Sequence, residues 1–78
     1  MRKVEVIWHD ACTRGGWSSR EDYLTSETAL VHSVGYLLYR DKKKIILVQS
    51  WDTTPGEPHV SDSVTIPAQW VKKVCFLS

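Results

Sequence analysis

The amino-acid sequence predicts a mainly β fold: a small five-stranded barrel with one short helix near the N-terminal half. The strongest indication is the second half of the chain, where turns separate the short apolar runs VGYLLYR, IILVQSW, SVTIP and VKKVCFL. A second indication is the first run, in which Val4, Val6 and Trp8 occupy alternate positions without an intervening glycine or proline. Closely spaced short strands of this kind are typical of small barrels.

The first half of the chain is expected to form a strand over residues 4–9, a break over 10–17 and then a helix. Gly15 and Gly16 fit poorly in a strand or helix, and Ser18 with Glu21 three residues later has the form of a capping box. This spacing predicts a short helix over residues 19–26. The pattern of alternate apolar positions returns over 31–40, which predicts a second strand.

A hairpin is expected next, with a turn over residues 41–44 and a strand over 45–51. The usual Asn-Gly or Asp-Gly turn signal is absent, so the sequence leaves the register open. Residues 45–48 are apolar at every position, which predicts a central strand covered on both faces.

The last third of the chain is expected to close the barrel, wholly or nearly. Residues 52–62 contain Pro55, Gly56 and Pro58 and are predicted to form an exposed irregular loop. A short strand over 63–66 ends at Pro67, the AQW segment makes a one-turn corner, and the final strand covers 71–77. With no internal repeat, residues 1–78 are predicted to be a single domain.

Length and charge restrict the function. A monomer of 78 residues buries a modest core, so self-association is expected to add stability and to cover open strand edges. A formal net charge of +1 gives the monomer no field that by itself implies strong binding to a phosphate backbone.

The expected location is the cytoplasm. The longest apolar run, Ile45 to Val48, is far shorter than the roughly 20 residues of a membrane span, so no membrane partner is predicted. The N-terminal segment lacks the apolar stretch of a signal peptide. Cys12 and Cys75 could form one disulfide at most and are both expected to be reduced.

Part of the sequence resembles a known family. The run VTIPAQWV and the following residues 72–77 resemble the last two strands and short helical turn of Sm-like proteins. The wider pattern of VIWHDACTRGGW, HSVGYLLYR, LVQSW and DSVTIP is similar to small proteins of tailed phages and marine viral metagenomes with an Sm-like fold. The resemblance implies an Sm-like or SH3-like barrel that assembles as a cyclic homo-oligomer, a pentamer to heptamer, in the host cytoplasm. It carries over no catalytic motif, and the Asp/Asn-Gly signatures with which cellular Sm proteins hold uridine are missing here.

Metal binding and catalysis are not predicted. His9, Asp10 and Cys12 are residue types that zinc accepts, but a structural site needs four ligands, and no CxxC or HxxxH partner exists. A nucleophilic pair of Cys12 and His9 is weighed against the commoner behaviour of a lone cysteine as a small buried hydrophobe. We therefore predict no enzyme, no catalytic residue, no metal and no cofactor.

Residues 8–20 are the first candidate ligand site. Gly16 lets backbone N–H groups approach a ligand, the following helix start offers more of them, and Arg14 and Arg20 flank the segment. Trp8 and Trp17 could stack a base. The alternative is an ordinary turn with Trp8 in the core. Ser50 and Trp51, at the polar end of the predicted central strand, are added to this candidate site. The predicted ligand-binding residues are Trp8, Asp10, Arg14, Gly16, Trp17, Arg20, Ser50 and Trp51.

For two further clusters the sequence allows two interpretations: ligand binding, or simple exposure to solvent. Lys42, Lys43 and Lys44 are either a solvated hairpin tip or, repeated around a ring, a basic annulus for nucleic acid; Lys72 and Lys73 add to the positive charge. The polar stretch of residues 49–51, with Asp62 and Ser63, either recognises a base edge or ribose or is the solvated end of a strand.

Three functions remain open from sequence alone. The first is binding of RNA or single-stranded DNA on a ring face. The second is a sponge that sequesters a small nucleotide signal of host immunity. The third is a structural module that contacts only protein.

Overall fold

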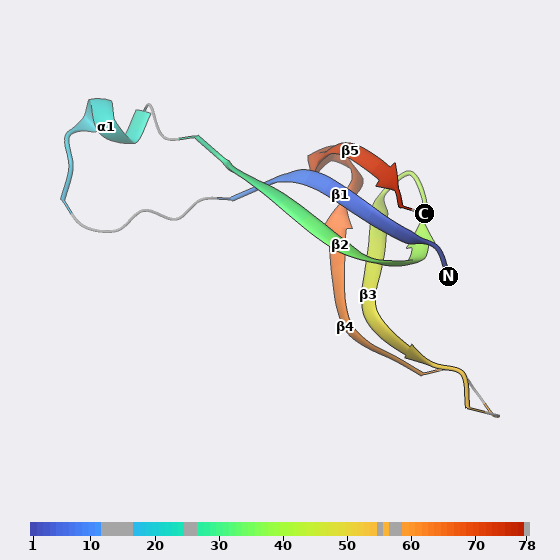
Figure 1. Ribbon diagram of the computed structural model, residues 1–78. Helices are drawn as coiled ribbons and strands as arrows, with labels where there is room; N and C mark the ends of the chain where they lie inside the picture. The colour runs from blue at the N-terminus through green and yellow to red at the C-terminus, as the bar shows by residue number, and fades with distance from the viewer. Residues whose placement is uncertain (12–16, 25–26, 55, 57–58, 78) are drawn as a thin grey trace.

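The computed structural model describes residues 1–11, 17–24, 27–54, 56 and 59–77, which form one antiparallel sheet and a short helix (Figure 1). The elements in chain order are β1 (Lys3–Asp10), α1 (Arg20–Leu24), β2 (Ala29–Arg40), β3 (Lys44–Asp52), β4 (His59–Pro67), the 3₁₀ turn η1 (Ala68–Trp70) and β5 (Val71–Phe76). The predicted mainly β fold with five strands and one short helix is confirmed.

The strand order is β4-β3-β2-β1-β5, and each neighbouring pair is antiparallel. β3 therefore lies inside the sheet, between β2 and β4. Ile45, Leu47 and Val48 are almost fully buried, as expected from a run that is apolar on both faces of the strand.

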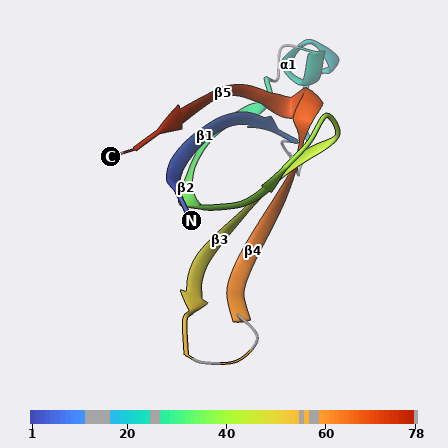
Figure 2. The ribbon, with the colours of Figure 1, turned by 90° about the vertical axis from the view of Figure 1, so that its right-hand side faces the viewer.

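The expected closure of the barrel is not observed. Within the described residues, β5 pairs with β1 and β4 pairs with β3, but β4 and β5 do not pair with each other. Figure 2 shows the reason: β4 runs down with β3 into a long hairpin, while η1 turns β5 away toward β1. The sheet is thus strongly curved, and no strand of the described part of the chain pairs with the outer edge of β4 or of β5.

The core is small and is held by three strands. Val4, Val6 and Trp8 alternate along β1 and pack against Ile45 and Leu47 of β3 and Ile66 of β4. At about 25 cal/mol per Å² of apolar area removed from water, these side chains supply the main stabilising term. The alternation seen in the sequence of residues 4–8 is therefore the core-facing pattern of β1.

The β2–β3 turn is built by Asp41 and tied to η1. Asp41 Oδ1 accepts hydrogen bonds from the backbone N–H groups of Lys43 (2.8 Å) and Lys44 (2.9 Å), and its Oδ2 accepts one from the Tyr39 hydroxyl (2.8 Å). The Ala68 N–H donates to the Lys43 carbonyl oxygen at 2.8 Å. This bond holds the lysine-rich turn against the corner that leads into β5.

Two sequence expectations need correction. β4 begins at His59 rather than at residue 63, because Ser50, Trp51 and Asp52 pair with Ser61, Val60 and His59 and so extend the ladder into the predicted loop. The helix begins at Arg20, one residue later than expected. Ser19, not Ser18, is its N-cap, since the Ser19 Oγ accepts a hydrogen bond from the Asp22 N–H at 3.2 Å. The expected helix end at Ser26 lies outside the described residues.

Candidate functional site

A pocket of about 350 Å³ opens between the β2–β3 turn, η1 and the start of β5. Its polar lining is mostly basic, comprising Arg40, Lys42, Lys44, Lys72 and Lys73 together with Asp41. Its apolar lining is Ile45, Ala68, Val71 and Val74. We call this the cationic pocket.

Three contacts explain why residues 40–44 and 68–74 lie together. Lys44 pairs with Pro67 at the end of the β3–β4 ladder, and the Ala68 N–H bonds to Lys43. η1 then makes one turn, after which Val71 pairs with Trp8 on β1. The two lysine groups, about thirty residues apart in sequence, are consequently brought to one pocket by the backbone itself.

Asp41, the one acidic residue of the lining, already accepts hydrogen bonds from within the turn. The Tyr39 hydroxyl and the N–H groups of Lys43 and Lys44 lower the pKa of Asp41, so Asp41 is ionised at neutral pH. Its hydrogen bonds are directed into the turn. Five of the lining residues are basic and one is acidic, so the local charge of the pocket favours an anion such as phosphate.

Trp8 lies in the core. It is 9% exposed, its Nε1–H donates to the Ser33 Oγ at 3.0 Å, and its ring stacks on Trp70 with centroids 6.4 Å apart and planes 10° apart. A base could reach the Trp8 face only by displacing Trp70. Asp10 ends β1, and its carboxylate accepts a hydrogen bond from the Ala11 N–H at 2.8 Å.

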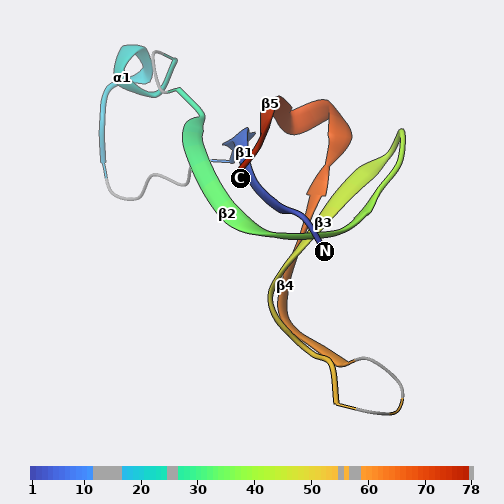
Figure 3. The same ribbon diagram turned by 45° about the vertical axis from the view of Figure 1, so that its right-hand side comes forward.

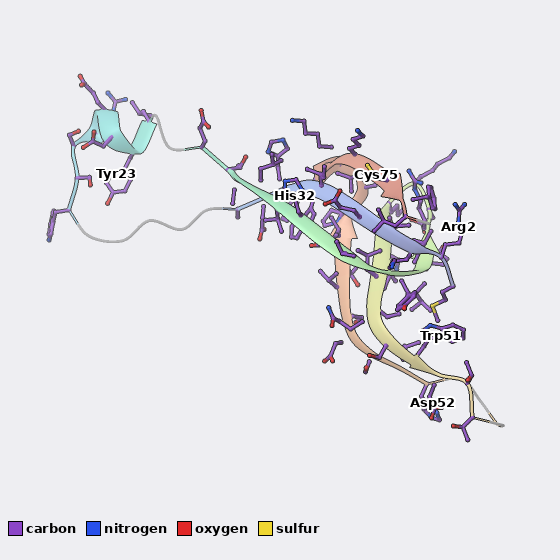
Figure 4. The ribbon with its side chains drawn as sticks, viewed as in Figure 1. Arg2, Tyr23, His32, Trp51, Asp52 and Cys75 are labelled. Carbon is purple, nitrogen blue, oxygen red and sulfur yellow. The ribbon has the colours of Figure 1, made fainter. Side chains whose placement is uncertain are left out.

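The other predicted ligand residues are spread over two projections. Trp17, before α1, and Arg20, at its start, are exposed, and α1 lies apart from the sheet (Figure 3). Ser50 and Trp51 are exposed on the outer part of β3, where Figure 4 places Trp51 beside Asp52 near the hairpin end. Arg14 and Gly16 lie outside the described residues.

The structure places two of the three lysines of the predicted basic tip at one pocket. Lys42 and Lys44 line the cationic pocket, whereas Lys43 is not among its lining residues. Sequence reasoning did not assign Arg40, Lys72 or Lys73 to a site. The sequence feature that could have indicated them is the pair Lys72 and Lys73 directly after the one-turn corner. Such a corner turns the chain back toward the ends of the strands that precede it.

No metal or catalytic centre emerges from the part of the chain that the structure describes. There, no three His, Cys, Asp or Glu side chains gather as metal ligands would. The His9 Nδ1 is hydrogen-bonded to the Thr28 Oγ1 at 3.1 Å, and Cys75 is a partly buried free thiol on β5. Cys12 lies outside the described residues. None of the described helices has the length and apolarity to cross a membrane.

Comparison of the chain with protein-family models, with curated proteins and with solved structures finds no match.

Proposed function

We propose that this chain is a non-catalytic, ring-forming Sm-like protein that binds RNA or single-stranded DNA through phosphate contacts in the cationic pocket. The observation that carries the proposal is that five basic residues, Arg40, Lys42, Lys44, Lys72 and Lys73, line one pocket of about 350 Å³, although the Lys44 Nζ itself lies 5.7 Å from the centroid of the Tyr39 ring. A protein of net charge +1 has no general affinity for polyanions, so binding must depend on such a local concentration of positive charge.

The ring part of the proposal rests on the two open edges. β4 and β5 each offer a row of backbone N–H and C=O groups that no described strand pairs with. A heterologous contact of the β4 edge of one copy with the β5 edge of the next closes into a ring when the rotation permits. The five-stranded antiparallel sheet and the one-turn corner before its last strand agree with the Sm-like resemblance of the sequence, and the proposed phage origin rests on that sequence resemblance alone.

A ring multiplies the cationic pocket. Each copy would bring its own pocket to the same face, so that a weak contact per subunit becomes strong through effective concentration along one strand of nucleic acid. This explains how a nearly neutral subunit could bind a polyanion without a large basic surface.

The test is the salt dependence of binding to a labelled single-stranded RNA. For single strands, log K falls with log salt with a slope of about −0.7 per neutralised phosphate. Replacing Lys72 or Lys73 by Gln is expected to weaken binding and to make the slope shallower by about 0.7 for each phosphate that is no longer neutralised. Lys3→Gln, which removes an exposed lysine outside the pocket, is the matched control. A binding constant that does not change with salt concentration, or that falls equally in all three variants, would overturn the proposal.

A second candidate function is sequestration of a small nucleotide, and the size of the pocket favours it. About 350 Å³ lies within the roughly 300–1,000 Å³ range of small-ligand sites. A ligand bound only by the folded state raises the melting temperature, so a panel of linear and cyclic nucleotides should include at least one that stabilises the protein. Lys72→Gln should reduce that shift. The absence of a shift with every nucleotide would remove this candidate.

A further inference from the structure

A second pocket, of about 300 Å³, lies where β2 and β3 separate. The ladder between these strands begins at Tyr36 and Val48, so the N-terminal part of β2 pairs with β1 alone, while the outer part of β3 pairs with β4 alone. The strands diverge from that point like the sides of a wedge. We call the space between them, lined by β2, β3 and β4, the wedge pocket.

The floor of the wedge pocket is apolar and its rim is polar. Leu47 and Val64, which belong to or pack against the core, line the inner part. Ser33, Gln49 and Asp62 line it as well, one from each of the three strands. His32 also belongs to the lining, but its Nδ1 lies 3.4 Å from Glu5 Oε2 on β1.

The three polar side chains have unused hydrogen-bonding capacity. The Ser33 Oγ accepts a hydrogen bond from Trp8 Nε1, which leaves the hydroxyl hydrogen for an acceptor on a ligand. Within the described residues, the Asp62 carboxylate has no hydrogen bond or ion pair. Gln49 offers both a donor and an acceptor. These three side chains would therefore complement a ligand that carries hydroxyl or N–H donors for Asp62 and an oxygen acceptor for Ser33.

The backbone at Asp62 is also unusual. Its φ is +55°, and it is the one non-glycine residue with positive φ in the described part of the chain. Asp and Asn tolerate this left-handed conformation better than other side chains, and residues held in such conformations are concentrated at binding sites.

From these observations we infer that the wedge pocket binds the ribose of a ribonucleotide, with Asp62 accepting hydrogen bonds from the vicinal hydroxyls. A carboxylate repels phosphate, so the pocket takes the uncharged part of the ligand, and a sugar diol supplies the two donors that a carboxylate accepts best. The apolar floor suits the carbon face of the sugar. The inference rests on the proposed function in its choice of a nucleotide, and it adds a preference for RNA over DNA.

The test uses nucleosides, because they lack the phosphate on which the cationic pocket depends. Each of the four ribonucleosides is titrated at millimolar concentration into the full chain, and backbone amide shifts are followed by NMR. At least one ribonucleoside should shift the amides of Ser33, Gln49 and Asp62, and its 2′-deoxy counterpart should do so several-fold more weakly. Absence of these shifts with all four, or equal shifts with the deoxy forms, overturns the inference and leaves the phosphate proposal intact.

Two variants at Asp62 distinguish the contribution of the carboxylate to binding from that of the left-handed backbone conformation. Asp62→Asn keeps the side-chain shape and Asp62→Gly keeps the left-handed conformation, so both should fold. Each should weaken ribonucleoside binding about tenfold, while Ser63→Ala, an exposed neighbour outside the pocket, should not change it. If RNA binding is tested in parallel, Lys72→Gln should weaken RNA and DNA alike, whereas Asp62→Asn should weaken RNA alone. Unchanged ribonucleoside binding in both Asp62 variants would contradict the role of this carboxylate.

Discussion

At the scale of single residues, Asp41 shows how one side chain can define a turn. Its carboxylate takes the place of a backbone acceptor for Lys43 and Lys44, which is the Asx-type turn that Asp and Asn favour. The Tyr39 hydroxyl fixes the other oxygen. Because this turn carries Lys42 and Lys44 and is bonded to η1, its geometry determines the mouth of the cationic pocket.

Asp41 is expected to make stability depend on pH in acid. The hydrogen bonds from Tyr39, Lys43 and Lys44 lower its pKa below the usual 3.8, so its contribution is present above that value and is lost as pH falls through the lowered pKa. Asp41→Ala should therefore lower the melting temperature by a few degrees at pH 7, and the difference between the two proteins should shrink as pH falls through the lowered pKa of Asp41.

Asp41→Asn serves as the control for this prediction, since the amide oxygen keeps an acceptor in the turn. Its loss of stability at pH 7 should be smaller than that of Asp41→Ala. Melting curves followed by circular dichroism across the pH range measure all three proteins. A gap between the wild type and Asp41→Ala that stays constant into acid would contradict the assigned role.

The sequence predicted some residues well and others not. Trp8 was predicted to bind a ligand, with a core position as the alternative; the structure buries it, as its alternation with Val4 and Val6 indicates. The turn at Asp41 was placed correctly but its cause was not found, because a single Asp before three lysines is a weaker signal than Asn-Gly. The sequence singled out Gln49 and Asp62 as a candidate site for a base edge or ribose, but the pocket that joins them to Ser33 depends on the φ of Asp62 and on diverging strands, which no local pattern reveals.

At the scale of elements, β2 and β3 approach each other tightly at Gly35. A Cβ at this position would lie 3.0 Å from the Val48 carbonyl oxygen and 3.3 Å from the Leu47 Cβ. Both neighbours belong to the central strand, where Val48 and Leu47 are nearly fully buried, so neither can shift easily. The absence of a side chain at Gly35 is therefore a packing requirement.

Gly35→Ala is expected to destabilise the protein. In an open strand the change from Gly to Ala would gain about 0.5–1 kcal/mol, because Gly loses more freedom on folding. Here the overlap with a buried strand should outweigh that gain, for a net loss of about 1–3 kcal/mol. Urea unfolding monitored by fluorescence measures the difference, and Val34→Ala, at an exposed position of the same strand, is the comparison. A stability equal to or above the wild type would show that the strands can separate freely.

The β3–β4 hairpin shows what local sequence reasoning could not predict. Pro55, Gly56 and Pro58 correctly indicated a break, but the mostly polar residues from His59 to Asp62 look like a loop and instead begin β4. Their strand conformation comes from the ladder with β3, whose cross-strand hydrogen bonds override weak propensity. The alternation of apolar residues over 4–8 and 64–66 and the continuous apolar run over 45–48 were enough to locate the core strands, because burial there is set by the side chains themselves.

At the scale of the whole molecule, the chain is elongated. Its radius of gyration is 16.4 Å and its principal extents are 58 × 23 × 22 Å, whereas a compact chain of this length has a radius of about 11 Å. Figures 1 and 3 show the cause: α1 and the outer β3–β4 hairpin project from the sheet in different directions. Large apolar side chains are exposed on both projections: Trp17 and Leu24 at α1, and Trp51 and Val60 on the hairpin.

This shape favours self-association. The folded monomer leaves two strand edges and several large apolar side chains in water, and its core is small for a stable free domain. Association of copies would bury both the edges and the side chains. Light scattering coupled to size exclusion is therefore expected to give a mass several times the 9.0 kDa of one chain.

Substitutions of opposite charge on the β4 edge test whether this edge of one copy pairs with the β5 edge of the next. If the β4 edge of one copy pairs with the β5 edge of the next, a new lysine at Thr65 would face the strand that carries Lys72 and Lys73, and like charges across a ladder repel. Thr65→Lys should shift the assembly toward monomer, whereas Thr65→Glu, equally exposed, should preserve or strengthen it. Light scattering over a range of salt distinguishes the two, because high salt should partly restore association of the lysine variant. Equal behaviour of both variants would place the contact elsewhere, and a 9.0 kDa mass for the wild type at every concentration would exclude the ring.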